Sequence, residues 1–189
     1  MKKINESKIK RLLHEYIKLK PLYKDFSLAV KFILETILKD NQFKYQVVSF
    51  REKQVDSLEK KLREDPKLKK LSLKSVQEID DLAGCRIIFY TDDDVQRFVN
   101  YIYKEFKVVK HNLKYSEDDY NALHLVVELK KDRLKLSEYA KFKRLRCEVQ
   151  LTTLLYHAWS EMAHGVVYKP EKDLLEFDKR AYNSLKKQF

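Results

Sequence analysis

The fold is decided by the stretch Arg144–Lys169, which reads R-L-R-C-E-V-Q-L-T-T-L-L-Y-H-A-W-S-E-M-A-H-G-V-V-Y-K. Up to Thr152 its apolar and polar residues alternate, which is the period of a β-strand with one apolar face. After Thr153, a suitable helix N-cap, the apolar residues recur at helical spacing. The polar strand face carries Glu148, and the helix carries two histidines and the single tryptophan. Together the two elements predict a cleft, although this stretch alone favours an edge strand with a solvated polar face.

The composition indicates one domain with a basic surface. The 189 residues are 44% hydrophobic, which is enough for one sizeable core. Forty Lys and Arg residues against 29 Asp and Glu residues leave a formal net charge of +11, so we expect a polyanionic ligand such as a nucleotide or a nucleic acid. The alternative is a lysine-rich surface that is simply solvated.

The two cysteines, Cys85 and Cys147, lie in apolar strand patterns without partners at metal-binding spacing. We therefore expect reduced core thiols and no zinc site. No apolar run reaches the length of a membrane-spanning helix, and the lysine-rich start lacks the apolar core of a signal peptide. These features predict a cytoplasmic protein that does not bind a membrane.

Helices and strands alternate along the chain. Helical spacing predicts helices over residues 5–20 and 25–39, with Pro21 marking the break between them. Further helices are expected over residues 51–65, 75–82, 92–106 and 137–143, and from residues 153 and 170 onward. Strands are expected over residues 45–50, 85–90, 107–112, 122–129 and 144–152. This order predicts the α/β (α+β) class, with a mixed β-sheet flanked by helices.

We divide this single globular unit into N-terminal helices (1–44), a core (45–169) and a C-terminal helix (170–189). The last helix is still amphipathic at Phe189, which suggests that a further C-terminal part follows in a longer protein.

Four segments carry polar residues that a plain core does not need. The first reads Arg51-x-Lys53-x₃-Ser57-x₃-Lys61. A helix that starts near Arg51 would place Lys53, Ser57 and Lys61 on one face, where they could cradle phosphates. A solvated basic helix is the more common alternative.

The other three segments lie next to expected strands. Asp80–Arg86 places carboxylates at the mouth of a buried strand, a usual position for a Mg²⁺ ligand, although paired aspartates are also ordinary turn residues. Asp119–His124 ends a charged loop with an aromatic residue and puts a histidine into an apolar strand, where a half-buried, hydrogen-bonded histidine is the alternative. The last segment combines the polar face of the organising strand with the helix after it: Glu148, Gln150, His157 and His164.

The order of these motifs resembles the synthetase domain of the RelA/SpoT family. The motifs are R-x-K-x₃-S-x₃-K, D-L-A-G-x-R, Y-x-x-L-H, E-V-Q-L-x-T and H-A-W-x-E-x-x-H-x-x-x-Y-K, and they cover residues 45–169. Each motif alone is weak, but five in this order are a specific signal. The resemblance implies a nucleotidyltransferase-like fold. It also implies transfer of the β,γ-pyrophosphoryl group of ATP to the 3′-hydroxyl of GDP or GTP, which makes the alarmone (p)ppGpp.

The resemblance also implies roles for the matched residues. Asp81 and Glu148 would hold Mg²⁺, Glu148 would also take the proton from the attacking 3′-hydroxyl, and His124 would lie near the transferring phosphates. The residues implied to bind ATP are Arg51 and Arg86 at the adenine, and Lys53, Ser57 and Lys61 at the phosphates. The residues implied to bind the acceptor are Tyr120, which would stack on its base, Gln150 and His157.

The chain departs from the family pattern around the acceptor. The usual Gly-Tyr-Arg-Ser reads Asp-Tyr-Asn-Ala over residues 119–122, and a lysine usual shortly before it is replaced at about Ser116. The usual E-x-Q-x-R-T ends here in Thr152-Thr153, so another cation is missing. Each lost charge-assisted contact to a free nucleotide is worth ~1.5–3 kcal/mol. A basic surface around a cleft with fewer cations suits an acceptor such as the 3′ end of a tRNA.

Three functions therefore stay open at the level of sequence. They are an alarmone synthetase, a toxin that pyrophosphorylates the 3′ end of tRNA, and a catalytically silent nucleotide-binding regulator. The presence of the implied catalytic residues disfavours the regulator. No H-D metal pair precedes the synthetase motifs, so we do not expect alarmone hydrolysis. The sequence leaves open whether an antitoxin or further copies of the chain bind it.

Overall fold

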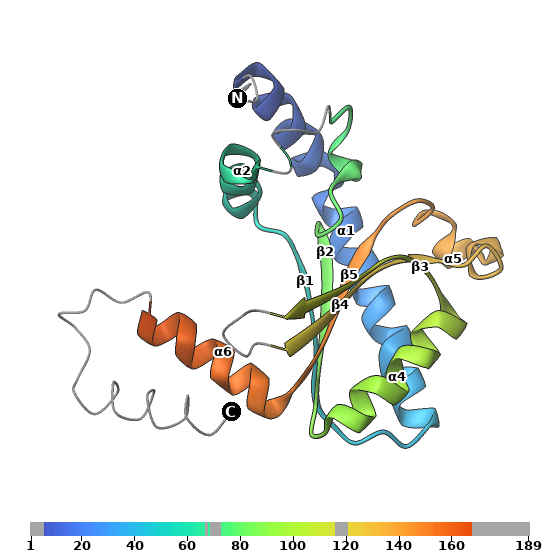
Figure 1. Ribbon diagram of the computed structural model, residues 1–189. Coiled ribbons are helices and arrows are strands. Elements are labelled where there is room, and N and C mark those ends of the chain that lie inside the picture. Colours follow the sequence, from blue (N-terminus) through green and yellow to red (C-terminus); the bar gives the residue numbers. More distant parts are fainter. Residues whose placement is uncertain (1–5, 67, 69–72, 116–120, 168–189) are drawn as a thin grey trace.

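The computed structural model describes residues 6–66, 68, 73–115 and 121–167. Its centre is a five-stranded sheet with the strand order β1-β2-β5-β4-β3 (Figure 1). The strands are β1 (Tyr45–Glu52), β2 (Ala83–Phe89), β3 (Phe106–Tyr115), β4 (Asn121–Leu129) and β5 (Cys147–Thr153). β2 and β5 run parallel and the other neighbours are antiparallel, which confirms the mixed sheet expected from the sequence.

The described residues also form helices. They are α1 (Glu6–Asp40), α2 (Val55–Glu64), α4 (Asp92–Glu105), α5 (Ser137–Ala140) and α6 (Leu154–Val167), with short 3₁₀ turns η1 (Val76–Glu78) and η2 (Arg133–Lys135). α1 lies against β1, β2 and β5, while α4 contacts β2, β3 and β5. α6 continues directly from the end of β5 and extends away from α1 and α4 (Figure 1).

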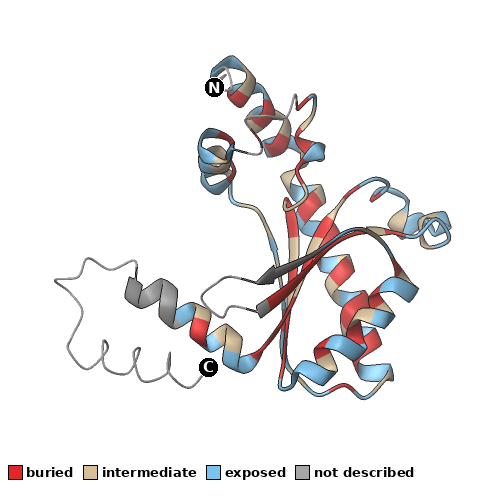
Figure 2. Cartoon of the chain, viewed as in Figure 1, coloured by how far each residue is buried: buried red, intermediate tan, exposed pale blue. Residues whose placement is uncertain are grey.

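The alternation in the organising strand sets the core. Its apolar residues Leu145, Cys147, Val149 and Leu151 are all buried, as the alternating pattern predicts. Cys85 of β2 points to the same side, because its Sγ lies 3.4 Å from the carbonyl oxygen of Ser27 in α1. Buried positions therefore gather on the sheet face next to α1 and α4 (Figure 2).

Two expected helix starts are confirmed by their caps. The Thr91 hydroxyl accepts from the backbone N–H of Asp94 at the start of α4. The Thr153 hydroxyl oxygen lies 3.5 Å from the backbone nitrogen of Tyr156, so that this residue caps α6.

The expected helix break at Pro21 is wrong, because α1 runs through it without interruption. Pro21 lies on the exposed side of the helix, whereas Tyr16, Tyr23 and Phe26 on both sides of it are buried. A proline inside a helix costs about 3 kcal/mol. Burying each large side chain contributes about 1.5–3 kcal/mol, so the core contacts on both sides outweigh that cost.

The expected helix start near Arg51 is also wrong. β1 continues to Glu52, and Arg51 pairs with Gly84 of β2. The backbone N–H of Lys53 then donates to the Leu82 carbonyl, and α2 begins only at Val55. Cross-strand hydrogen bonds to β2 thus hold a segment that helical spacing alone assigned to a helix.

The remaining differences concern element lengths. The helix expected over residues 75–82 is only η1. β3 extends three residues beyond residue 112. The helix expected after Pro170 lies outside the described residues. In the described part of the chain, no helix combines the length and apolar character that crossing a membrane requires.

Candidate active site

The face of the sheet that points away from α1 carries two rows of aligned positions. Residues paired on neighbouring strands point to the same face, so the register assigns them directly. One row contains Arg51, Gly84 and Glu148, and the next contains Ser49, Arg86, Gln150 and His124. Four of the eight residues predicted to bind ATP or to react therefore lie on one face, although they come from four strands: Arg51, Arg86, Glu148 and His124.

Asp81 forms an ion cluster at one end of this face. It lies in the turn before β2, and its Oδ2 accepts from the ammonium groups of Lys53 at 2.7 Å and Lys61 at 2.8 Å. Burial alone would raise the pKa of Asp81, but the two ammonium groups outweigh it and the pKa is lowered. Ser57 lies one turn before Lys61 on α2 and is exposed. Two lysines and an aspartate from three separate segments thus meet in one ion cluster.

Glu148 is the centre of a second group. His124 Nδ1 lies 2.8 Å from Glu148 Oε1, and Gln150 Nε2 donates to Glu148 Oε2 at 3.0 Å. Arg86 Nε in turn donates to Gln150 Oε1 at 3.1 Å. Burial would raise the pKa of Glu148, but the hydrogen bonds from His124 and Gln150 lower it, so that it remains a carboxylate. Because a carboxylate can only accept, Nδ1 of His124 carries the proton in this pair.

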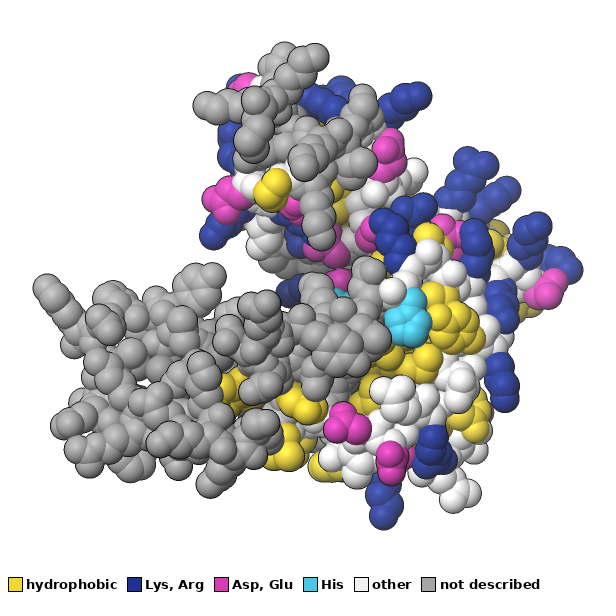
Figure 3. All heavy atoms as spheres, in the orientation of Figure 1, with side chains coloured by type: hydrophobic (Ala, Val, Ile, Leu, Met, Phe, Trp, Pro, Cys, Tyr) yellow, Lys and Arg dark blue, Asp and Glu magenta, His cyan; other side chains and the backbone are white. Residues whose placement is uncertain are grey.

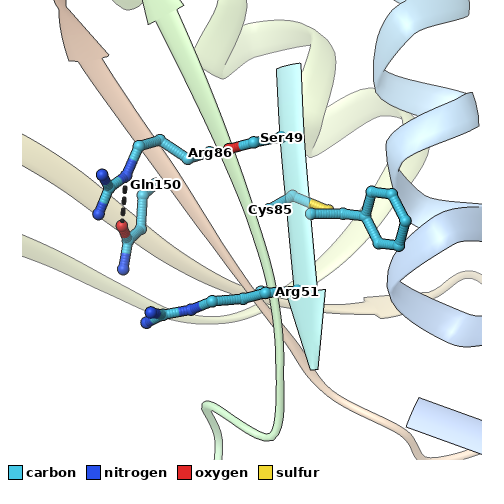
Figure 4. A pocket seen from close by; sticks show the side chains of 7 residues that line it. Ser49, Arg51, Cys85, Arg86 and Gln150 are labelled. Carbon is cyan, nitrogen blue, oxygen red and sulfur yellow. Dashed lines mark hydrogen bonds between the residues drawn. The ribbon is translucent and has the colours of Figure 1, made fainter. Parts of the chain in front are cut away.

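Arg51 and Arg86 flank a pocket on the same face. Its lining includes Ser49, Gly84 and Gln150, and both arginine side chains project to the side opposite Cys85 (Figure 4). A Cβ added at Gly84 would lie 3.6 Å from Arg51 Cγ and 3.7 Å from the Glu148 carbonyl oxygen. The missing side chain at Gly84 therefore leaves the floor beneath Arg51 open, which suits a flat ring placed between two guanidinium groups.

The carboxylates of Asp81 and Glu148 fit the Mg²⁺ ion that the sequence implies. Asp81 Oδ1 is buried and has no hydrogen-bond partner among the described residues. The negative charge of Asp81 acts to raise the pKa of Glu148, so the two carboxylates lie within electrostatic range. The described residues contain no group of three or more His, Cys, Asp or Glu side chains placed to hold a metal. Two carboxylates are nevertheless a usual protein contribution to Mg²⁺, whose other ligands are waters and substrate phosphates.

The residues predicted to bind the acceptor are less completely described. Gln150 lies between Arg86 and Glu148, at the centre of the site. His157 lies on α6 and is partly buried, and the hydrogen bonds of the two groups above do not include it. Tyr120 and the side chain of His164 lie outside the described residues. Near the site, α6 contributes Glu161, whose carboxylate is 3.9 Å from Arg86 Nη1.

A chain of ion pairs beside the site was not predicted from the sequence. Asp80 Oδ1 accepts from Arg146 Nη1 at 2.8 Å, and its other oxygen accepts from Lys110 Nζ. Glu128 accepts from Arg146 Nε at 3.3 Å and from Lys107 Nζ at 2.9 Å. The alternation of the organising strand places Arg146 on the same face as Glu148, but nothing in the sequence indicates its partners.

Basic side chains are spread widely over the surface. Lys and Arg side chains project along the right-hand margin of the face in Figure 3, with Asp and Glu side chains between them. Several of them form exposed ion pairs, such as Lys135 with Asp132 and Lys141 with Asp25. Exposed pairs of this kind contribute little to stability.

The chain is similar to known proteins in sequence and in fold. Residues 50–173 match the family pattern described as "Region found in RelA / SpoT proteins". The chain is 28% identical over 144 residues to the GTP pyrophosphokinase YjbM of Bacillus subtilis (strain 168), and the match covers 71% of this chain and 64% of that enzyme. The matched part of the chain therefore spans slightly less than two thirds of the length of YjbM.

Solved structures share the fold. The small alarmone synthetase 1 from Bacillus subtilis superimposes with a TM-score of 0.67 at 26% identity, over 92% of this chain and 93% of that one. A structure of small alarmone synthetase 1 from Bacillus subtilis bound to its product pppGpp gives a TM-score of 0.61 at 24% identity, over 88% and 90% of the two chains.

Proposed function

The chain belongs to the RelA/SpoT family, and on this basis we propose that it transfers the pyrophosphoryl group of ATP to the 3′-hydroxyl of GDP or GTP. The observation that carries the proposal is the meeting of Lys53, Lys61 and Asp81 on the polar side of the site that also holds Glu148. Cations for a polyphosphate and carboxylates for a divalent ion are the groups that phosphoryl transfer requires. The similarity to GTP pyrophosphokinase YjbM supports the same reaction.

In this proposal, ATP binds across the two groups of residues around Asp81 and Glu148. Arg51 and Arg86 hold the adenine from its two sides, in the pocket above Gly84. Lys53 and Lys61 turn toward the phosphates, with the Ser57 hydroxyl one turn away on α2. The two ammonium groups share one carboxylate oxygen of Asp81, which holds them close together at the site.

The reaction forms one bond and breaks one. The 3′-oxygen of the acceptor attacks the β-phosphorus of ATP, the bond between that phosphorus and the α,β-bridging oxygen breaks, and AMP leaves. The hydroxyl proton passes to the carboxylate of Glu148, whose oxygens each keep a lone pair beside the bonds from His124 and Gln150. Mg²⁺ held by Asp81 and Glu148 would neutralise the negative charge of the phosphates.

The acceptor lies on the other side of Glu148 in this arrangement. Tyr120 stacks on its base, while Gln150 and His157 contact it from the strand and from α6. The buried Nε2 of His124 has no partner among the described residues, and it faces the transferring phosphates in this proposal.

Transfer of label from ATP tests the proposal. ATP labelled at the β-phosphate is incubated with the protein and Mg²⁺ in parallel with GDP, GTP and deacylated tRNA. Label should appear in ppGpp or pppGpp, and AMP should form in equal amount. Absence of transfer to all three acceptors, while the protein is folded and binds ATP, would favour the silent nucleotide-binding regulator.

A tRNA acceptor is the second candidate, and Thr152 is the observation that favours it. The resemblance leads us to expect an arginine at this position, on the face of β5 that also carries Glu148 and Gln150. Thr152 is instead 2% exposed, so neither this side chain nor a cation extends into the site. The site then offers fewer charges to the phosphates of a free nucleotide, whereas a tRNA end would bring its phosphates to the basic surface outside. Transfer to tRNA without transfer to GDP or GTP would select this candidate.

A further inference from the structure

The backbone of Lys53 is fixed by two other parts of the chain. Its N–H donates to the Leu82 carbonyl at 2.9 Å, and its carbonyl accepts from the Tyr16 hydroxyl at 2.5 Å. Its side chain reaches Asp81, the residue next to Leu82, at 2.7 Å. The connection between β1 and α2 is therefore held on both sides at the residue whose ammonium group belongs to the site.

Tyr16 reaches Lys53 from inside the core. Its side chain lies on α1 with no exposed surface, and its ring centre is 6.0 Å from that of Tyr23. A buried phenol needs a hydrogen-bond partner, and here it is the Lys53 carbonyl. Burial raises the pKa of Tyr16, so the hydroxyl keeps its proton and acts as the donor.

Neighbouring residues of α1 hold the same region. Lys20 Nζ donates to Oε1 of Gln54 at 3.0 Å, and Gln54 directly follows Lys53 in the chain. Glu15 accepts from the Val76 N–H at 3.2 Å and from the Ser75 hydroxyl, in the segment that leads to Asp81. The contact of Lys20 is exposed and contributes little, whereas the contact of Tyr16 is partly buried. Of these contacts, the hydrogen bond of the Tyr16 hydroxyl is the one that reaches Lys53 itself.

We propose that Tyr16 is a positioning residue, which holds Lys53 where its ammonium group meets the phosphates of the nucleotide. A lysine side chain already has four rotatable bonds, so the position of its ammonium group is defined only if the backbone that carries it is also fixed. The identity of the nucleotide rests on the function proposed above, but the contact between Tyr16 and Lys53 does not.

Tyr16→Phe tests this role, because it removes only the hydroxyl and keeps the buried ring. One lost hydrogen bond should raise the KM for ATP about fivefold and leave kcat and the KM for the acceptor within about twofold. Tyr23→Phe is the matched control, since it removes the same atoms from another buried tyrosine of α1. A merely structural loss would lower the active fraction, and thus kcat, without changing the KM for ATP.

A double-mutant cycle shows whether Tyr16 acts through Lys53. The dissociation constant of MgATP is measured by calorimetry for the wild type, Tyr16→Phe, Lys53→Met and the double variant. Tyr16→Phe should weaken binding about fivefold in the wild type but by less than about twofold when Lys53 is already replaced. Equal effects in both backgrounds would overturn the proposal.

A measurement without nucleotide separates this proposal from the proposed function. In Tyr16→Phe, hydrogen exchange of the Lys53 amide should become at least about fivefold faster than in Tyr23→Phe, because one support of this segment is lost. Unchanged exchange would refute the positioning role whatever the enzyme does. Faster exchange in a protein that does not bind ATP would support the role of Tyr16 and refute the proposed function instead.

Discussion

Replacing Glu148 with Gln removes one negative charge from the site while keeping the size of the side chain. The carboxylate accepts from His124 at Oε1 and from Gln150 at Oε2. The introduced amide has one oxygen and one NH₂ group, so either His124 Nδ1 or Gln150 Nε2, which are both donors, would face its NH₂ group. Either His124 changes tautomer, or Gln150 turns over and loses the bond that its Oε1 accepts from Arg86.

The expected cost to stability is small. A hydrogen bond to a charged group contributes about 1.5–3 kcal/mol, but the neutral amide is easier to bury and is not repelled by Asp81. We therefore expect the free energy of unfolding to change by less than about 2 kcal/mol, which corresponds to a shift in Tm of no more than about 8 °C.

The expected cost to activity is much larger. A general base contributes about 10²–10⁴-fold to the rate, and an amide cannot take up the proton. We expect kcat for pyrophosphoryl transfer to fall at least about 100-fold, or about 2.7 kcal/mol of transition-state stabilisation. The KM for ATP should change much less than kcat.

Glu128→Gln is the control for this experiment. Glu128 lies on β4 with a side-chain exposure of 16%, close to the 19% of Glu148, and it also accepts hydrogen bonds from two side chains, Lys107 and Arg146. Initial rates of labelled transfer and thermal unfolding curves are compared for both variants and the wild type. Glu148 is not the general base if Glu148→Gln keeps more than about a tenth of kcat, or if Glu128→Gln loses as much activity.

Other regions of the molecule give further predictions. The pKa of Asp81 is lowered in the folded protein, so its contribution to stability is present above about pH 4 and is lost as the pH falls through the folded pKa. The free energy of unfolding of Asp81→Asn, measured with urea between about pH 3 and 7, should therefore depend less on pH than that of the wild type. An unchanged pH dependence would contradict this. Tyr120→Ala should raise the KM for the acceptor about 5–150-fold, from ~1–3 kcal/mol of lost stacking, and an equal loss for ATP would indicate a structural tyrosine. If tRNA is the acceptor, replacing Lys69 and Lys70 by Gln should reduce the log–log salt slope of tRNA binding by about one unit per lost contact, with no effect on GTP. Burial raises the pKa of Cys147, so this thiol should resist alkylation until the protein unfolds. Fast alkylation of the native protein would show that Cys147 is not buried in the core.

The sequence by itself determined the elements whose signal is local. The alternation around Glu148 predicts both the organising strand and its buried side, because residues two apart in a strand share one face. The position of Thr153 predicts the start of α6, because a cap acts within one turn. Lys53, Lys61 and Asp81 could be named as candidate site residues through their motifs, although the helix expected from Arg51, which grouped the two lysines, begins only at Val55.

Tertiary structure alone decided how distant segments meet. Pro21 stays inside a helix because residues on both sides of it pack into one core, and this packing stabilises the helix. The spacing of apolar residues around the proline does not reveal this stabilisation. Arg51 belongs to a strand because β2 pairs with it. The Tyr16 hydroxyl meets a backbone carbonyl 37 residues away, and every residue has such a carbonyl. Nothing in the sequence distinguishes the carbonyl of Lys53 from the others, so its hydrogen bond to Tyr16 follows only from the packing of α1 against the end of β1.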